Sequence, residues 1–269
     1  MKSVRCAIWG KEGSGKSTMA LTFPKPISHF DIDVGGYDRA IWRIDEADIK
    51  STSYAIPIQK EKLMGASKEG AGTTIRFPRQ VVGQKELWQR IVTDYIRDCQ
   101  NPKIKTIIID SATQLWFICH QGKLQEKQEI QLSKGMKVED DRFREKLQPV
   151  EYPNDRMRDL IYAAKGYDKN LVVTHYPRNI YKERFGSNGK VVTFKSDDIE
   201  PDGFKDTSKL VDVVFWTYTE IDSSTKKVLG RAKITIKCGI PGLGMTAVGL
   251  ELPSPTYEGI IQAKEAMEG

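Results

Sequence analysis

One short segment near the amino end limits what this chain can fold into. Residues Gly10–Ser17 read GKEGSGKS, follow the apolar run Val4–Trp9 and precede Thr18–Phe23, which reads as the body of a helix that Pro24 and Pro26 end. Closely spaced glycines let the backbone turn sharply between a strand and a helix. A strand, a glycine loop and a helix in this order are typical of an α/β fold.

Strand and helix patterns alternate along the rest of the chain. The strands are expected at Ile27–Ile32, Thr106–Asp110, Leu171–His175, Leu210–Tyr218, Arg231–Lys237 and Met245–Leu252. The helices are expected at Gln84–Cys99, from about Ala112 to Gln131, Asn154–Gly166 and Ser254–Met267. This alternation predicts a mainly parallel sheet flanked by helices, with antiparallel strands added near the carboxyl end.

The predicted organisation is a single domain over residues 1–269 with three loop-rich insertions. The insertions are expected at about 45–80, 133–153 and 176–209. The first holds a small-residue loop at 65–72 and a possible strand at 73–77, and the third carries turn signals typical of an extended hairpin or a mobile loop.

Composition narrows the class of protein. Hydrophobic residues make up 39% of the chain and the net charge is +6, which is ordinary for a folded protein and permits a polyanionic partner. No apolar run approaches the roughly 20 residues of a membrane span, and the amino end lacks the apolar stretch of a secretory signal. The four cysteines form no CxxC pair. A cytoplasmic protein is expected, without a membrane partner.

The glycine loop fits the phosphate-binding pattern GxxxxGK[ST]. In this pattern backbone N–H groups cradle phosphates, Lys16 reaches the β- and γ-phosphates, and Ser17 binds Mg²⁺. Thr18 is expected near the α-phosphate. The alternative is a glycine turn with a surface lysine. The predicted nucleotide-binding residues are Gly10, Lys11, Glu12, Gly13, Ser14, Gly15, Lys16, Ser17 and Thr18.

A carboxylate near the magnesium is needed beside such a loop. Asp110 ends the apolar run TIIID, and the carboxyl ends of parallel strands meet at one edge of a sheet. We therefore expect Asp110 to act as the Walker B carboxylate, a role compatible with the alternative of capping the next helix. The residue that follows is Ser111 rather than glutamate, which weakens an AAA+ assignment.

The segment Phe30–Gly36 (FDIDVGG) resembles that of the RecA-like recombinase ATPases. The resemblance implies that Asp33 polarises the attacking water, although the family usually has glutamate there and a turn-forming aspartate is the alternative. It also implies that His175, at the end of LVVTH, senses the γ-phosphate; a histidine that only forms a hydrogen bond at the strand end is the alternative.

The chain is most similar to the phage Sak-type single-strand-annealing ATPases, also described as phage nucleotide-binding or AAA proteins. The amino-terminal glycine loop, FPKP at Phe23–Pro26, the aspartate-glycine segment and the DS pair after the buried strand carry this resemblance. It covers about residues 1–35, 104–117, 170–180 and 230–262, and is weak at 37–80 and 120–165. It implies ATP as the nucleotide, Mg²⁺ as the metal, and activity in recombination, annealing or replication.

The same resemblance implies contact with single-stranded DNA. Basic residues interleaved with aromatics suit phosphates and stacked bases, and the candidates are Arg178, Lys182, Arg184 and Lys190. Neighbouring acidic residues offset their charge, so a solvated hairpin is the alternative. RecA-like ATPases assemble as rings or filaments, which implies a homo-oligomer whose neighbouring copy supplies a cation. Lys237 is the first candidate for it, and Arg231 and Lys233 are the others.

Three functions are compatible with these motifs. The first is an Mg²⁺-dependent ATPase that acts on single-stranded DNA, with a single-stranded-DNA-binding protein or a replisome component as a further partner. The second is a nucleotide-gated interaction protein with little turnover, such as a helicase loader or a replication scaffold. The third, a small-molecule kinase, ranks last because no segment reads as the arginine-rich lid typical of such enzymes.

Overall fold

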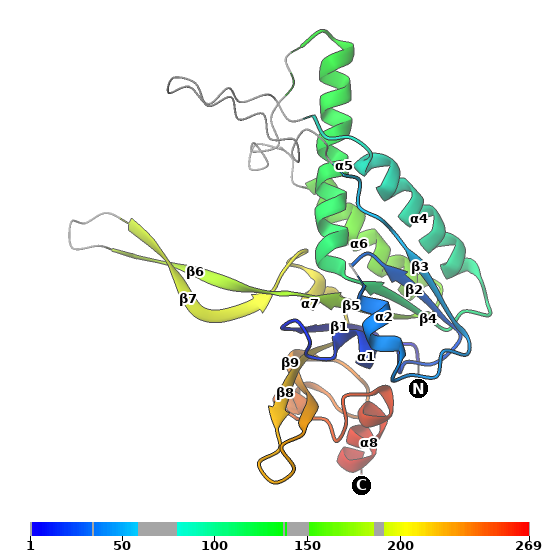
Figure 1. Cartoon of the computed structure of the whole chain (residues 1–269), viewed down its shortest axis with the longest axis vertical. Coiled ribbons are helices and arrows are strands. Elements are labelled where there is room, and N and C mark those ends of the chain that lie inside the picture. Colours follow the sequence, from blue (N-terminus) through cyan, green and yellow to red (C-terminus); the bar gives the residue numbers. More distant parts are fainter. Residues whose placement is uncertain are drawn as a thin grey trace.

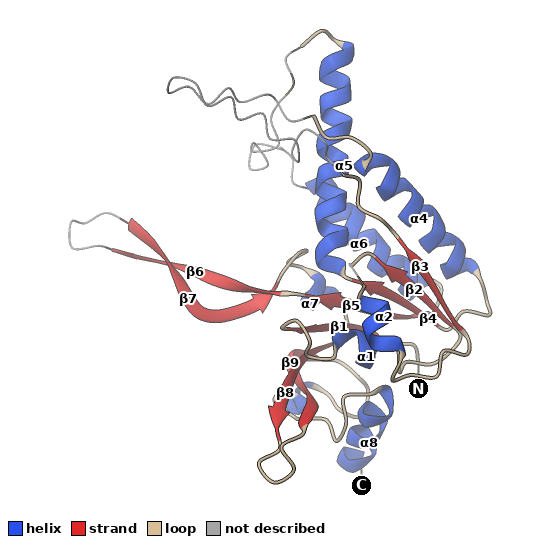
Figure 2. Ribbon diagram, viewed as in Figure 1, coloured by secondary structure: helices blue, strands red, loops and turns tan. Residues whose placement is uncertain are grey.

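A seven-stranded sheet forms the centre of the protein (Figure 2). The computed structural model describes residues 2–33, 35–58, 80–136, 138, 151–185 and 191–268. The strand order is β3-β2-β4-β5-β1-β8-β9, with all neighbours parallel except β8 and β9. The strands are β1 (Arg5–Gly10), β2 (Ile27–Asp31), β3 (Ile49–Ser53), β4 (Thr106–Asp110), β5 (Asn170–His175), β8 (Val213–Ile221) and β9 (Val228–Cys238). The architecture predicted from the sequence is confirmed.

Helices cover both faces of the sheet (Figure 1). The first layer consists of α4 (Gln84–Gln100), α5 (Ala112–Ser133) and α6 (Glu151–Gly166), and the second of α1 (Lys16–Ala20), α2 (Gly36–Ile41) and α8 (Tyr257–Glu268). Successive side chains of β4 point to opposite faces of the sheet and so contribute to the hydrophobic core under each helix layer. Ile107 and Ile109 pack under the first layer and Ile108 under the second. Such a strand is apolar on both faces, which explains the continuous run TIIID.

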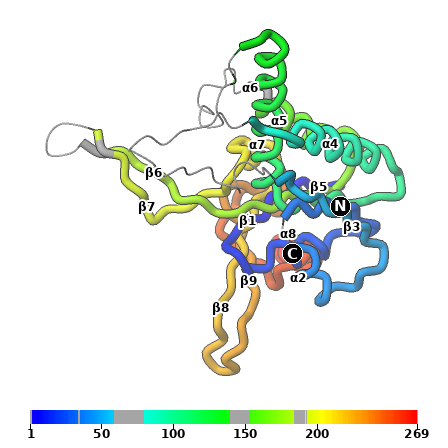
Figure 3. Tube along the Cα trace, turned by 45° about the horizontal axis from the view of Figure 1, so that its top comes forward, coloured from blue at the N-terminus to red at the C-terminus, as the bar shows by residue number. Residues whose placement is uncertain are grey.

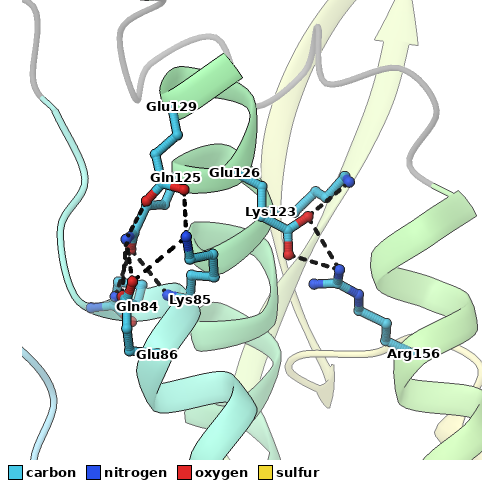
Figure 4. A network of polar contacts seen from close by, with 8 residues as sticks. All are labelled: Gln84, Lys85, Glu86, Lys123, Gln125, Glu126, Glu129 and Arg156. Carbon is cyan, nitrogen blue, oxygen red and sulfur yellow. Dashed lines mark hydrogen bonds and ion pairs between the residues drawn. The ribbon is translucent and has the colours of Figure 1, made fainter. Parts of the chain in front are cut away.

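Glutamine side chains join α5 to the start of α4 (Figure 4). Gln125 Oε1 accepts hydrogen bonds from the backbone N–H groups of Gln84 and Lys85 at 2.8 and 3.0 Å. Gln128 Oε1 accepts from the N–H of Val81 at 2.7 Å. The first N–H groups of a helix have no partner within it, and here a neighbouring helix supplies the acceptors.

A two-stranded hairpin leaves the body of the protein between β5 and α7 (Thr207–Leu210). It consists of β6 (Pro177–Phe185) and β7 (Val191–Pro201), which pair only with each other in the described part of the chain. The hairpin projects away from the sheet and helices in both views (Figures 1 and 3). Of the two alternatives expected for 176–209, an extended hairpin or a mobile loop, the structure contains the hairpin.

Other local expectations were wrong or incomplete. Residues 245–252 do not form a regular strand; Met245–Ala247 is a short 3₁₀ helix (η2). Residues 249–252 still run beside β9, with one isolated bridge from Glu251 to Lys233 and backbone hydrogen bonds to Ile234 and Ala232. Gly244 and Gly249 have φ values of 62° and 100°, which interrupt an extended conformation. The segments 65–72 and 73–77, Lys190 and most of the insertion at 133–153 lie outside the described residues. None of the helices in the described ranges combines the length and the apolarity that crossing a bilayer requires.

Candidate phosphate-binding site

The glycine loop bends back on itself at the carboxyl end of β1. Gly13 and Gly15 have φ values of 74° and 91°, a conformation that side chains disfavour. Gly10 packs so closely on β8 that an added Cβ would lie 2.4 Å from the carbonyl oxygen of Thr217. Ser14 Oγ lies 2.8 Å from Thr217 Oγ1, so the loop is fastened to β8 as well as to its own strand.

A cavity of about 230 Å³ opens beside this loop. Its wall consists of Glu12, Gly13, Gly15, Lys16, Ser17, Thr18, Asp33, Gly36, Arg39, Ala40, Arg43, Asp110 and Tyr176. Most of the predicted nucleotide-binding residues therefore meet in one place. Gly10, Lys11 and Ser14 are not part of the wall. The carbonyls of Gly10 and Lys11 instead accept hydrogen bonds from Lys16 Nζ, both at 3.0 Å.

The ammonium group of Lys16 is held in the cavity by several partners. It lies 4.8 Å from the centre of the Tyr176 ring, within the range of a cation–π contact. Burial lowers the pKa of Lys16, while the charges of Asp110, Asp33 and Glu12 act in the opposite direction. A cation kept near carboxylates in a partly closed site is suited to receive an anionic ligand.

Asp110 lies where a magnesium ligand is needed. Its Oδ1 accepts a hydrogen bond from Thr174 Oγ1, while its buried Oδ2 has no hydrogen-bond partner within the part of the chain that the structure describes. Burial raises the pKa of Asp110, but contacts with His29, Ser17 and Thr174 outweigh it and hold the pKa below its usual range. The carboxylate is therefore ionised at neutral pH.

The surroundings of Asp110 Oδ2 fit a small hard cation. A Cβ added at Gly36 would lie 3.3 Å from this oxygen and 3.7 Å from Ser17 Oγ, so a glycine borders the space beside both atoms. A carboxylate oxygen and a hydroxyl are the donors that Mg²⁺ accepts alongside phosphates and water. Ser17 and Asp110 would hold the ion. Sequence analysis did not single out His29, whose Nε2 lies 3.7 Å from Asp110 Oδ2.

Asp33 lies in the cavity wall, two residues after the end of β2. Its carboxylate accepts a hydrogen bond from the hydroxyl of Tyr176. Burial and this contact raise the pKa of Tyr176, so the phenol remains protonated and continues to donate. The carboxylate expected to orient water thus has a partner that was not predicted from the sequence. Tyr176 lies just after the predicted strand Leu171–His175, whose last residue was the candidate.

The expectation that His175 touches a phosphate needs correction. His175 lies on the α5 side of β5, where its Nδ1–H donates to the carbonyl of Asp202 at 2.8 Å, and it is not in the cavity wall. Side chains alternate along a strand. Of the residues to each side of His175, Thr174 donates a hydrogen bond to Asp110 and Tyr176 lies in the cavity wall.

Lys237 lies far from the cavity of its own chain. Its neighbour Cys238 pairs with Val213, which in turn pairs with Cys6 at the start of β1, whereas the glycine loop follows the end of β1. Lys237 Nζ donates to the carbonyl of Lys209 at 2.8 Å. This position leaves Lys237 without a role in its own cavity, and a contribution to a neighbouring copy stays a prediction.

The basic residues proposed for DNA lie on the hairpin, and two of them are already paired. Arg178 donates from Nε and Nη2 to Glu200 at 2.9 and 2.7 Å, and Lys182 pairs with Asp198 at 2.5 Å. Arg184 is part of β6, opposite Val192. Lys195, which pairs with Tyr181 across the hairpin, is exposed.

Two arginines of the cavity wall were also missed. Arg39 and Arg43 come from α2 and the turn after it. The short helix Gly36–Ile41 lies in a stretch with mixed signals, and the only local hint was the Gly35–Gly36 pair before it. A spacing of three and four residues among positions 36, 39, 40 and 43 is the signal that could have identified them.

Comparisons with known proteins identify a family for this chain. A sequence profile described as an AAA domain matches residues 2–229. No protein with curated annotation matches the chain significantly. Among solved structures, a KaiC-like protein from the hyperthermophilic archaeon Pyrococcus horikoshii is similar, with 8% sequence identity, a TM-score of 0.44, and coverage of 94% of this chain and 85% of that one. The profile match spans most of the chain, including both Lys16 and Asp110. This chain belongs to the AAA domain family.

Proposed function

We propose that the chain is an Mg²⁺-dependent ATPase whose nucleotide state controls the contact of the β6–β7 hairpin with single-stranded DNA, in phage-type recombination, annealing or replication. One observation carries this proposal. Tyr176 lines the phosphate cavity, contacts Asp33 and Lys16, and is the residue directly before β6. A ligand that changes these contacts acts on the base of the hairpin.

The roles in hydrolysis follow from the positions in the cavity. Lys16 neutralises charge on the β- and γ-phosphates, and the carboxylate of Asp33 orients the attacking water. When bound at Ser17 and Asp110, Mg²⁺ supplies positive charge to the phosphates. The hydroxyl of Tyr176 occupies an acceptor site on the Asp33 carboxylate that the attacking water needs. The hydrogen bond from Tyr176 must therefore break before water can bind there.

The base of the hairpin is tied to the cavity on both strands. The N–H of Tyr176 donates to Thr113 Oγ1 at 3.1 Å, and its carbonyl accepts from the N–H of Asp202 at 2.7 Å. Asp202 follows β7 and also accepts the hydrogen bond of His175. A shift of Tyr176 is therefore passed to both ends of the hairpin rather than to one strand.

The distal hairpin carries groups suited to a single strand. Tyr181 is 67% exposed and lies directly across from the exposed Lys195, so a ring and a cation share one face. Phe194 is 37% exposed and lies opposite Lys182 on the other face. Exposed rings stack on bases and neighbouring cations neutralise phosphates, without a need for a particular sequence.

The test is ATP hydrolysis with and without single-stranded DNA. We expect hydrolysis to depend on Mg²⁺, to rise when single-stranded DNA is added, and to fall at least about 100-fold in Lys16→Ala because transition-state charge is no longer neutralised. Tyr181→Ala combined with Lys195→Ala is expected to keep the basal rate and lose the stimulation. Undiminished turnover in Lys16→Ala would overturn the assignment of the site.

A second candidate function rests on the charge balance of the hairpin. The ion pairs Arg178–Glu200 and Lys182–Asp198 neutralise cations that DNA would need, while Val191 and Phe194 stay exposed. These features favour a protein partner and a nucleotide-gated interaction protein with little turnover. Slow hydrolysis that single-stranded DNA does not change, together with ATP-dependent capture of a replisome component, would favour this alternative.

A further inference from the structure

One face of α2 and the turn after it forms part of the cavity. The wall contains Gly36, Arg39, Ala40 and Arg43, which are spaced by three, one and three residues. The adjoining face, with Tyr37, Ile41 and Ile44, packs against the hydrophobic core on that side of the sheet, and Ala40 belongs to that core as well as to the cavity wall. Since a helix places residues three and four apart on the same side, this packing fixes the direction of Arg39 toward the phosphate site.

Arg39 has an unused guanidinium group. Among the described residues it forms no ion pair, although Glu12, Asp33 and Asp110 line the same cavity. Its Nη1 lies 3.4 Å from the position of a Cβ at Gly35, which places it at the start of α2, close to Asp33 in the chain. Arg43 differs, because its guanidinium lies 4.4 Å from the centre of the Trp42 ring. Arg39 is thus the arginine available to a bound anion.

We propose that Arg39 is a catalytic residue that contacts the terminal phosphate of ATP from within the same chain. The inference rests on the proposed ATPase function and deepens it. In hydrolysis, water forms a bond to the γ-phosphorus, the bond to the bridging oxygen of the β-phosphate breaks, and ADP and phosphate leave. Asp33 takes the proton from water. Arg39 neutralises charge that develops on the transferring group, so a cation from a neighbouring copy is not required.

The first experiment separates binding of the terminal phosphate from binding of the rest of the nucleotide. Affinities for ADP and for the slowly hydrolysed analogue ATPγS are measured with Mg²⁺ for the full chain and for Arg39→Ala. We expect Arg39→Ala to lose about tenfold or more in ATPγS affinity and less than about twofold in ADP affinity. The single-turnover rate with ATP is expected to fall at least about 100-fold.

Two variants control for general effects. Arg90→Ala removes an exposed arginine of α4 that lies outside the cavity and over the ring of Tyr54. It is expected to leave both affinities and the rate within about twofold of the unaltered chain. Arg39→Lys keeps the charge but not the planar fork, and is expected to recover part of the ATPγS affinity. Equal losses for ADP and ATPγS in Arg39→Ala would overturn the proposal.

A mixing experiment tests the source of the cation. Lys16→Ala protein keeps Arg39 but lacks its own phosphate site, and Arg39→Ala protein has the reverse defect. If Arg39 acts within its own chain, an equal mixture hydrolyses ATP no faster than the two proteins separately. Restored hydrolysis in the mixture would overturn the proposal. Failure of the unaltered chain to bind ATPγS would instead reject the ATPase function itself.

Discussion

At the scale of single residues, the end of β5 divides two tasks between neighbours. His175 points to the α5 side and binds the carbonyl of Asp202, whereas Tyr176 points to the phosphate cavity and contacts Asp33. The imidazole of His175 is buried, and its hydrogen bond to Asp202 restrains the backbone next to Tyr176. His175 therefore contacts the residue after β7 rather than the cavity wall, and the lowering of its pKa by burial bears on the stability of the fold.

The burial of His175 predicts a pH dependence of stability. Burial lowers its pKa to about 4, from an ordinary value near 6.5 in the unfolded chain. Between these values the unfolded state binds more protons, so the free energy of unfolding falls as pH drops from 6.5 toward 4. At pH 5.5 the loss from this group is about 1.4 kcal/mol.

Urea unfolding at pH 7.5 and 5.5 measures this effect. His175→Asn retains a donor for the carbonyl of Asp202 but does not titrate, so its loss of stability between the two pH values is expected to be smaller by about that amount. His120→Asn serves as the control, since it replaces a histidine that lies in α5 rather than in β5. The interpretation is contradicted if His175→Asn and the unaltered chain lose the same free energy.

The residues of the site differ in how far sequence alone could place them. The glycine loop, Lys16, Ser17 and Asp110 could be placed because their chemistry is encoded locally, in a fixed spacing and at the end of an apolar run. Arg39 and Tyr176 could not, because their importance depends on which face of α2 and β5 meets the cavity. That direction is set by packing against distant residues rather than by neighbours in the sequence.

At the scale of elements, the polar face of α5 is as important as an apolar one. Gln121, Gln125 and Gln128 are buried along this helix; Gln125 accepts hydrogen bonds from the start of α4, and Gln128 accepts one from Val81 in the segment before it. Gln125 also donates from Nε2 to Glu86 and Glu129. The helices therefore dock through hydrogen bonds between side chains and backbone as well as through apolar packing, and such directional contacts restrict their relative position.

Gln125→Leu is expected to destabilise the protein. Leucine is similar in size but leaves the N–H groups of Gln84 and Lys85 without their acceptor in a buried place. A lost acceptor of this kind costs about 2 kcal/mol, measured as a decrease in the free energy of unfolding in urea. Gln89→Leu, on the exposed face of α4, is expected to change it by less than about 0.5 kcal/mol. Equal effects of both substitutions would show that the shared acceptor is not important.

Elements with strong local patterns were easier to predict than short ones. Thr106–Asp110 was predicted with its observed bounds, and Gln84–Cys99 was one residue short of α4. β3 was missed because its sequence IKSTS lacks an apolar alternation and, at the edge of the sheet, none of its residues is fully buried. The strand predicted at residues 245–252 was wrong because the prediction followed the apolar composition and ignored Gly244 and Gly249, which interrupt an extended backbone.

At the scale of the whole molecule, the protein has two separate sheets. The seven-stranded sheet with its helices forms the body, and the two-stranded hairpin joins this body at Tyr176 and Asp202. Near this junction Ile199 packs against the main core, so the base of the hairpin belongs to the body. Farther out, Tyr181 and Val191 are 67% and 54% exposed. The outer part buries little apolar surface, and a two-stranded hairpin contributes little stability by itself.

Replacing residues 181–195 with a short Asn-Gly turn is therefore expected to leave the body intact. The free energy of unfolding should change by less than about 1 kcal/mol, because few buried contacts are lost. Binding of ATPγS should persist, while stimulation of hydrolysis by single-stranded DNA should disappear. Shortening the exposed turn between β8 and β9, at residues 222–227, is the matched control and should preserve the stimulation. If the hairpin variant still responds to single-stranded DNA, the DNA-binding surface lies on the body, and the junction at Tyr176 does not connect it to the nucleotide.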